Sequence, residues 1–298
     1  MKKFLVKILL FFLCVAVLDC LFGIAMQYMN DRPKGGGSKS RYYVCKESNE
    51  DVLIFGSSRA KHHYVPDVIE DTLGMTCYNA GEDGNGIILC YGFLKMISTR
   101  YLPKLIIYDV TGFDMYEDDN FKYLDILKPF YYEPGIDSLF WKVEPKTRVM
   151  MLSNLYRYNT TCLRVIGNFV HPMVNYPKGY SALHRTMEYE PEITFKKAGT
   201  VDSVKLGFFE KFLKCANERG ISMVCCVSPS YKPQIDTAYY APVKELCDRY
   251  NIVFLDDMSD SEISSNKEYF QDSRHLNDTG ARLFTSKLAK FIKSLPNS

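Results

Sequence analysis

The sequence predicts an α/β protein built on a five-stranded parallel sheet, and three observations lead to that class. Short apolar runs rich in β-branched residues alternate with longer segments whose apolar residues recur at helical spacing. The order is strand, helix, strand, helix, strand up to residue 110, and the same alternation resumes after residue 200. A composition with 47% hydrophobic and 24% charged residues provides an ample core. Such alternation predicts parallel strands joined by right-handed crossovers.

Residues 1–29 have the charge and apolar layout of a cytoplasmic tail and a membrane anchor. Lys2 and Lys3 precede an apolar run that only Lys7 and Asp19 interrupt. Its length suits one span of roughly 20 residues. The lysines should hold this end in the cytoplasm, which places the rest of the chain outside the cytoplasmic membrane. A cleaved signal peptide is the alternative, although no clear small-x-small site follows the run.

Residues 30–48 are predicted to be a linker, since the segment 30–40 is rich in glycine, serine and charge. The α/β domain then covers 49–298. Its first strand is expected at 51–55, where Asp-Val-Leu-Ile-Phe forms a run suited to a strand buried on both faces. The elements expected next are a helix at 62–73, a strand at 75–79, a helix at 86–101 and a strand at 104–110.

Between residues 111 and 200 the alternation stops, and the segment is rich in aromatic residues. Helical stretches are expected at 121–127 and 147–170, and 173–194 looks irregular. We interpret 111–200 as an insertion after the third strand, with a lid over the sheet as one role, because insertions of this length are more often functional than idle. The elements expected after it are a helix at 201–219, a strand at 221–227, a helix at 241–250, a strand at 252–255 and a final helix at 277–295.

Two polar segments of this sequence carry the residue types of nucleophilic acyl chemistry. Gly56-Ser57-Ser58 follows the first strand, at the carboxyl edge where open α/β sheets keep their ligands. Asp272 lies three residues before His275 in a loop ahead of the last helix. A serine, a histidine and a carboxylate are the nucleophile, base and orienting acid of that chemistry. The structural alternatives are a helix cap for Ser58, a turn residue for Asp272 and a packed or solvated histidine for His275.

The order of these motifs resembles the SGNH (GDSL-type) hydrolase superfamily over nearly all of 51–295, apart from the insertion. Five strands, a serine after the first, Asn-x-Gly after the second and Asp-x-x-His before the last helix agree in order and spacing. The resemblance implies a three-layer, flavodoxin-like fold. It also implies a Ser58–His275–Asp272 triad, with Ser57 replacing the acid of the family's Gly-Asp-Ser block.

The resemblance further implies an oxyanion hole made by the backbone N–H groups of Ser58 and Gly81. The sequence departs from the family's third block, Gly-x-Asn-Asp, because residues 109–114 contain no asparagine. An oxyanion hole short of one donor could lose a few kcal/mol of transition-state stabilisation. Asn85 is a candidate for the missing amide; a cap for the following helix is the alternative.

Two further residues are weaker candidates for substrate binding. Arg59 could steer an anionic substrate, or pair with Asp83 or Glu82. Tyr231 lies on the expected ligand edge after the fourth strand, in a segment whose composition is that of any turn. The adjacent histidines His62 and His63 would point about 100° apart on a helix, which makes a poor metal pair.

Charge and cysteine usage exclude several classes of protein. Of 37 basic and 35 acidic residues, five and two lie in the first 34 positions, so the remainder holds 32 and 33 and shows no basic face for nucleic acid. Ten cysteines include two in the apolar run, and the other eight show no Cys-x-x-Cys pair and no zinc spacing. Buried free thiols are favoured, and a disulfide stays open as an alternative.

The Gly-Ser-Ser variant resembles membrane-anchored relatives that act on cell-envelope polymers and exopolysaccharides. We therefore expect a serine esterase or O-acyltransferase, deacetylase- or acetyltransferase-like, acting on cell-surface or exported glycans through an acyl-enzyme. Its partners would be an acylated carbohydrate or other small ester and the membrane, with no nucleic acid, metal or cofactor; partners in envelope biosynthesis stay open. The alternative is a catalytically silent relative that binds polysaccharide or scaffolds an envelope assembly, which the missing third-block asparagine favours.

Overall fold

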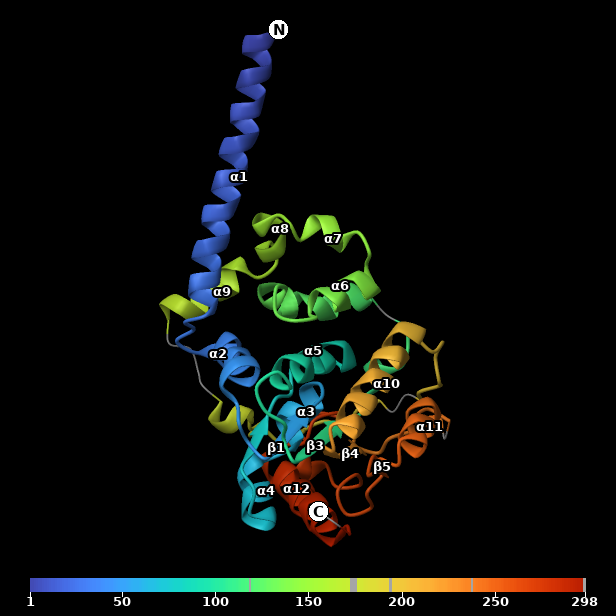
Figure 1. Cartoon of the computed structure of the whole chain (residues 1–298). Helices are drawn as coiled ribbons and strands as arrows, with labels where there is room; N and C mark the ends of the chain where they lie inside the picture. Colours follow the sequence, from blue (N-terminus) through green and yellow to red (C-terminus); the bar gives the residue numbers. More distant parts are fainter. Residues whose placement is uncertain (118, 172–175, 193–194, 237, 297–298) are drawn as a thin grey trace. The chain divides into compact units, whose positions relative to one another are not determined.

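The computed structural model describes residues 1–298 except 118, 172–175, 193–194, 237 and 297–298 (Figure 1). The chain divides into two compact units. The first joins Met1–Tyr43 to Leu124–Asn175, and the second joins Val44–Tyr123 to Tyr176–Ser298. This partition cuts across the predicted one, because the middle of the predicted insertion shares a unit with the N-terminal apolar helix.

The second unit contains a parallel sheet of five strands in the order β2-β1-β3-β4-β5. This is the flavodoxin-like strand order, in which the chain reverses direction across the sheet between β1 and β3. The predicted α/β class and all five predicted strands are confirmed. The strands are β1 (Val52–Phe55), β2 (Cys77–Asn79), β3 (Leu105–Asp109), β4 (Ser222–Val227) and β5 (Val253–Asp256).

Helices cover both faces of this sheet, as alternation along the strands requires. Ile54 and Ile107 belong to a buried cluster with Phe284 of the last helix. Their neighbours in sequence point the other way, and Phe55 and Tyr108 pack edge-on or tilted against Phe212. The helices of this unit are α3 (Ser58–His63), α4 (Pro66–Leu73), α5 (Ile87–Ile97), α10 (Ser203–Glu218), α11 (Ala241–Arg249) and α12 (Asp278–Ser294), with 3-10 turns at η2 (Gly112–Asp114), η4 (Pro177–Gly179) and η5 (Lys267–Tyr269).

The prediction of one continuous helix at 62–73 is wrong. The chain forms α3 and α4 in its place, and Pro66 stands in the first turn of α4. Val65 is extended, with φ −95° and ψ 108°, because the proline ring disfavours a helical conformation in the residue before it. This early stop leaves α3 only six residues long, and it begins at Ser58 itself.

The first unit is helical. Its longest element is α1 (Lys2–Asn30), the one helix within the described residues that is long and apolar enough to cross a membrane. The other helices of the unit are α2 (Gly36–Tyr42), α6 (Asp137–Val143), α7 (Thr147–Met150), α8 (Asn154–Tyr158) and α9 (Cys162–Val170). Two short helical elements cross the borders of the units, η1 (Tyr43–Glu47) and η3 (Asn120–Phe130).

Three predictions for these segments need correction. The glycine-rich part of the predicted linker forms α2, whose Ser38 accepts a hydrogen bond from Asn168 Nδ2 at 2.6 Å, so a tertiary contact overrides composition. The helix expected at 147–170 is three helices, and Ser153 starts the second by accepting from the N–H of Tyr156. The stretch at 121–127 is part of a 3-10 helix that contains Pro129. All ten cysteines lie in described parts of the chain and are free thiols.

Candidate active site

The turn after β1 places Ser58 at the carboxyl edge of the sheet. Gly56 has φ +145°, and a Cβ there would lie 2.8 Å from the carbonyl oxygen of Asp109, so only glycine fits. Ser57 then caps α3 by accepting a hydrogen bond from the N–H of Arg59. Ser58 is therefore the first residue of α3, where backbone N–H groups lack an acceptor within the helix.

A hydrogen-bonded loop ahead of α12 holds the histidine and the acid. Oδ1 of Asp272 accepts from the backbone N–H groups of Arg274 and His275, at 2.8 and 3.0 Å. The N–H of Gln271 donates to the carbonyl of His275 at 2.9 Å. The three-residue spacing between Asp272 and His275 thus forms one closed turn that contains both residues.

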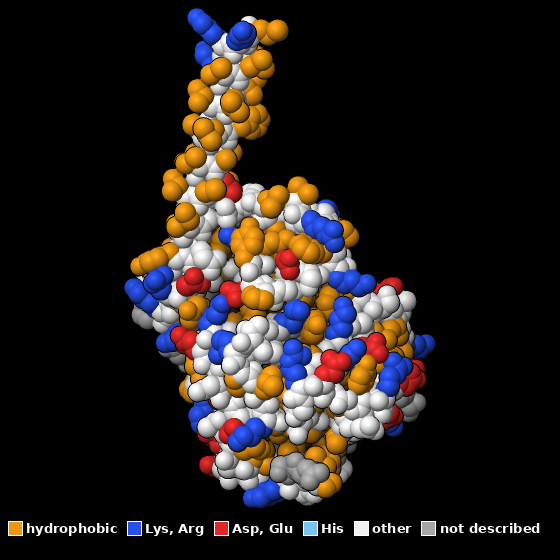
Figure 2. All heavy atoms as spheres, viewed as in Figure 1, with side chains coloured by type: hydrophobic (Ala, Val, Ile, Leu, Met, Phe, Trp, Pro, Cys, Tyr) orange, Lys and Arg blue, Asp and Glu red, His pale blue; other side chains and the backbone are white. Residues whose placement is uncertain are grey.

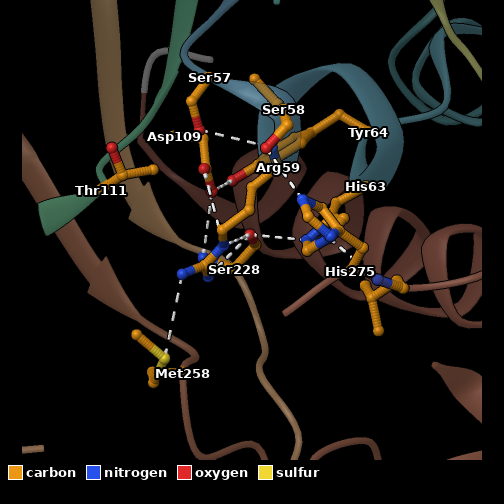
Figure 3. Close-up of polar contacts among 12 residues, drawn as sticks. Ser57, Ser58, Arg59, His63, Tyr64, Asp109, Thr111, Ser228, Met258 and His275 are labelled. Carbon is orange, nitrogen blue, oxygen red and sulfur yellow. Dashed lines mark hydrogen bonds and ion pairs between the residues drawn. The ribbon is translucent and has the colours of Figure 1, made fainter. Parts of the chain in front are cut away.

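The three side chains form one continuous hydrogen-bonded chain. Oγ of Ser58 lies 2.9 Å from Nε2 of His275, and Nδ1 of His275 lies 2.9 Å from Oδ2 of Asp272. Because an ionised carboxylate only accepts, the Nδ1 proton faces Asp272 and leaves the Nε2 lone pair for the Ser58 hydroxyl. Figure 3 shows the Ser58 hydroxyl directed at the His275 ring. The imidazole and carboxylate side chains remain 25% and 37% exposed, so the chain is open to solvent.

The charge state of Asp272 suits this arrangement. Burial alone would raise the pKa of its carboxyl group, but hydrogen bonds from the His275 ring and from the two backbone N–H groups outweigh that effect. The pKa of Asp272 is therefore held below its ordinary value. The carboxylate is ionised at neutral pH and can stabilise an imidazolium beside it.

A buried polar network, which the sequence did not reveal, contacts the loop that contains His275 (Figure 3). Arg59 donates through Nε and Nη2 to the Ser228 hydroxyl at 3.1 and 2.9 Å, and it lies 3.9 Å from the buried Asp109 carboxylate. Nδ1 of His63 lies 2.9 Å from the same hydroxyl. Nε2 of His63 accepts the N–H of Leu276 at 3.0 Å, one residue after His275.

This network keeps His63 neutral. Burial lowers the pKa of His63 well below its ordinary value, and the positive charge of Arg59 adds to that effect. Since Nε2 accepts from Leu276, the single ring proton is on Nδ1 and points to Ser228. Strand β4 ends next to Ser228, so the network joins the end of that strand to the histidine loop. A polar residue directly after a strand was the signal in the sequence; the pairing with His63 was not readable there.

A cavity of about 510 Å³ opens beside Ser58 and His275. It lies at the edge expected for this strand order, since loops after β1, β3, β4 and β5 contribute to it. Four of its residues are cationic and one, Glu117, is anionic. Burial lowers the pKa of Lys196, and the charges of Arg274 and Arg59 lower it further. The lining residues are Ser57, Ser58, Arg59, Gly84, Thr111, Gly112, Tyr116, Glu117, Lys196, Lys205, Ser230, Tyr239, Tyr240, Met258, Arg274 and His275.

The two predicted oxyanion donors other than Ser58 are engaged elsewhere. The Gly81 N–H donates to Oδ1 of Asn79 at 2.9 Å, and a Cβ at Gly81 would lie 2.5 Å from the backbone nitrogen of Lys61. The glycine is thus explained by close approach to α3. Asn85 donates through Nδ2 to the carbonyl of Asp83 within its own loop, and it does not cap α5, whose N-cap is Gly86. Both groups thus have partners inside their own loop, and their role as oxyanion donors stays a prediction.

The weaker candidates have structural partners. Arg59 faces Asp109 and Ser228, whereas Asp83 pairs with Lys61 at 2.7 Å and with the His62 ring at 3.2 Å. Tyr231 is buried, and its hydroxyl donates to Glu190 at 2.9 Å. Arg59 lines the cavity beside Ser58, and Tyr231 lines a smaller one of about 120 Å³. Within the described residues, no cluster of three or more histidine, cysteine or acidic side chains could hold a metal ion.

The second unit is therefore a parallel α/β domain with a serine, a histidine and a carboxylate in hydrogen-bond reach at its ligand edge. No family model and no curated protein matches the chain. One similar solved structure is described as "a putative platelet activating factor from Streptococcus pneumonia"; identity is 11%, the TM-score 0.44, and the match covers 94% of this chain and 98% of the other. Another is "a gut microbial diltiazem-metabolizing enzyme", with 13% identity, a TM-score of 0.36, and coverage of 82% and 46%. At these scores neither likeness says which reaction this chain performs.

Proposed function

We propose that this protein is a serine esterase or O-acyltransferase of the SGNH type that acts on acylated glycans. One observation carries the proposal: Ser58, His275 and Asp272 form a hydrogen-bonded chain at 2.9 and 2.9 Å, and Ser58 and His275 line an open cavity. If Ser58 were only a helix cap, Asp272 only a turn residue and His275 only a surface histidine, none of these roles would require the three side chains to come together. Ser58 and His275 are nevertheless in hydrogen-bond contact although 217 positions separate them in the sequence.

The reaction follows from these roles. Nε2 of His275 takes the proton of the Ser58 hydroxyl while Oγ attacks the ester carbonyl, and Asp272 stabilises the resulting imidazolium. Collapse of the tetrahedral intermediate breaks the ester C–O bond, and the leaving alkoxide takes the proton back from His275. Water or a sugar hydroxyl then gives its proton to His275 and attacks the acyl-enzyme. The bond between Oγ and the acyl carbon breaks, Ser58 takes the proton back from His275, and the acyl group leaves as an acid or a new ester.

The negative charge of the intermediate needs donors, and the start of α3 provides one. The Ser58 N–H belongs to the first turn of that helix, whose positive end favours an anion. The helix is short, so we assign further stabilisation of the anion to the cationic residues that line the cavity. Arg274 lies in the histidine loop itself, between Asp272 and His275.

The size and the lining of the cavity also suit a carbohydrate ester. Tyr116, Tyr239 and Tyr240 present aromatic rings on its walls, and aromatic faces are apolar surfaces against which sugar rings stack. A volume of about 510 Å³ lies in the range of small-ligand sites. The excess of cationic over anionic lining favours glycans or acyl groups that carry negative charge.

Replacing the nucleophile tests the proposal. In the purified full-length protein, Ser58→Ala should lower hydrolysis of p-nitrophenyl acetate and of acetylated oligosaccharides by at least about 10³-fold. A fluorophosphonate probe should label the parent but not this variant. Ser57→Ala is the matched control: it removes the neighbouring hydroxyl and a helix cap, which costs about 1 kcal/mol of stability, but it keeps the nucleophile and should keep labelling. Parent activity in Ser58→Ala would reject the assignment.

The silent, glycan-binding alternative is favoured by one specific observation. Residues 109–114 stand where the family has its third block, and they contain no asparagine, so that loop offers no side-chain amide. The Thr111 hydroxyl itself donates to Asp114 at 3.1 Å. A protein of this kind would bind oligosaccharide equally well before and after the Ser58→Ala substitution, and it would show no probe labelling. The fluorophosphonate experiment therefore separates the two functions.

A further inference from the structure

Asp19, the one acid inside the apolar run of α1, is satisfied by the start of another helix. Its carboxylate accepts from the backbone N–H groups of Asn154 and Leu155, both at 2.8 Å. It also accepts from the Ser153 hydroxyl at 2.9 Å and the Asn154 amide at 3.0 Å. The two backbone groups belong to the first turn of α8 and have no acceptor within that helix. Asp19 therefore acts as a cap supplied by α1 to α8.

The C-terminal part of α1 also packs on α8 and α9 in the same unit. Met26 is buried in a cluster with Tyr158 and Val165. The Tyr158 hydroxyl donates to the side-chain carbonyl of Gln27 at 2.8 Å. A Cβ at Gly23 would overlap Asn154, so the glycine allows the close approach of the two helices. A signal peptide that is removed needs none of these contacts, and its loss would uncover them.

The length of α1 decides how far a bilayer reaches along it. The apolar part free of these contacts, Phe4–Leu18, is 15 residues and about 22 Å long. A bilayer's hydrocarbon core is about 30 Å thick and needs roughly 20 residues. The remaining 8 Å or so must come from the stretch between Asp19 and Ile24, where α8 and α9 contact the helix. Lipid chains that cover this stretch therefore reach α8 as well.

Helices α7, α8 and α9 expose large apolar side chains, as such contact requires. Val149 is 73% exposed, Leu152 70% and Leu163 82%. Orange side chains gather on the surface over α7 and α8 in Figure 2 as they do along α1. We call this surface the lipid face; its residues are Val149, Leu152, Leu155 and Leu163.

We propose that α1 is a retained membrane anchor and that the lipid face lies in the outer leaflet beside it, in contact with acyl chains. Three features favour a bilayer over a protein partner or a second copy. The face belongs to the unit that contains the membrane helix; the free part of that helix is too short to span alone; and Arg148 stacks on Trp141 4.7 Å away, the pair of side-chain types that occupies membrane interfaces. This inference does not depend on the proposed reaction.

Fluorescence quenching by brominated lipid in proteoliposomes tests the placement. Trp141 is the single tryptophan, so Trp141→Phe removes the background signal. In that full-length background, Leu152→Trp and Leu163→Trp should lose at least half of their emission when the acyl chains are brominated. Lys39→Trp is the control, since Lys39 is an exposed residue of α2 in the same unit, past the end of α1, and it should lose under a tenth.

Two other outcomes would overturn the proposal. In the first, tryptophan emission from positions 152 and 163 is not quenched by brominated lipid but shifts as the protein-to-lipid ratio rises. This result would assign the lipid face to contact with a second copy of this chain. An intact mass of the membrane-bound protein that lacks the first 20 to 30 residues would show that α1 is removed. Circular dichroism that matches the parent in each tryptophan variant excludes misfolding as the cause of any result.

Discussion

At the scale of single residues, the candidate site depends on which ring nitrogen of His275 carries the proton. The Asp272 carboxylate accepts from Nδ1, and this leaves Nε2 able to take the Ser58 proton. The three residues could be singled out because a serine after a strand and an Asp-x-x-His loop each carry a local signature. Their convergence at hydrogen-bond distance was predicted only from the resemblance to the SGNH superfamily, since two segments 217 positions apart leave no joint pattern in the sequence.

The substitution Asp272→Asn tests the role of the carboxylate in orienting His275, because it leaves the Ser58 nucleophile in place. An amide in place of the carboxylate can donate to Nδ1 and favour the wrong tautomer, so kcat should fall by roughly 10² to 10⁴ while KM changes little. Steady-state kinetics on p-nitrophenyl acetate measure this. Asp260→Asn, an acid paired with Lys287 in the same unit, is the control and should keep near-parent kcat. An unchanged kcat in Asp272→Asn would remove the acid from the mechanism.

Arg274 should matter for anionic substrates alone. Its side chain lines the cavity and is exposed, so Arg274→Gln removes an interaction of about 1 kcal/mol with a bound anion. KM for an ester with a charged acyl group should rise by 3- to 10-fold, and KM for a neutral ester should stay the same. Lys290→Gln on the exposed side of α12 is the control. Equal effects on both esters would mean that Arg274 acts on the loop and not on charge.

His63 should make stability fall in acid. Its pKa is lowered by burial, so between its unfolded value of 6.5 and lower pH the unfolded chain binds a proton that the folded chain does not. The contribution of this group is therefore complete above pH 6.5 and is lost as pH decreases. At pH 5 the loss is at most about 2 kcal/mol, the limit that 1.4 kcal/mol per pH unit sets.

Urea unfolding of the parent and of His63→Gln at pH 7.5 and pH 5 measures that loss. The glutamine keeps an acceptor for the Leu276 N–H but does not titrate. The free energy of unfolding of the parent should decrease more than that of the variant, so that the gap between them narrows in acid. A gap that is constant with pH would show that His63 titrates alike in the folded and unfolded chains.

At the scale of elements, α3 is positioned by glycines on two sides. Gly56 allows the chain to turn beside β3, and Gly81 allows the loop after β2 to approach the backbone of Ala60 and Lys61. The sequence predicted strands well because each is a short apolar run with clear ends. It predicted helices less well, since Pro66 and Ser153 end or start them inside continuous apolar patterns, and only tertiary contacts decide whether such a break is tolerated.

Gly81→Ala should shift α3 and its first residue, Ser58. A Cβ would lie 2.5 Å from the Lys61 nitrogen, and overpacking of this kind costs about 1–3 kcal/mol. We expect lower unfolding free energy together with lower kcat, although the Gly81 N–H is retained. Gly207→Ala in α10 is the control, because no atom lies within 4 Å of its Cβ position and alanine favours the helix. Parent-like stability in Gly81→Ala would contradict the close approach.

At the scale of the whole molecule, the α/β class and strand order could be predicted, whereas the two-unit division could not. The periodicity of a sequence indicates which faces of its helices are apolar, but it does not indicate which other element covers them. The pattern of residues 124–175 is therefore the same as that of an ordinary insertion. Their partner is α1, and nothing local in the sequence marks Asp19 as the cap of a helix that starts at Asn154. An acid inside an apolar run was the one available signal, because its burial demands a donor from elsewhere.

The capping of α8 by α1 also sets an order of events during synthesis. Gln27 is synthesised 131 residues before its hydrogen-bond partner Tyr158. At about 5–20 residues per second, this separation is a delay of roughly 7 to 26 seconds. Throughout that interval the N-terminal helix is already made while the surface it belongs to has not yet left the ribosome. Its carboxylate must meanwhile be tolerated by translocon, water or lipid, so newly made chains should be most vulnerable to quality-control proteases in those seconds.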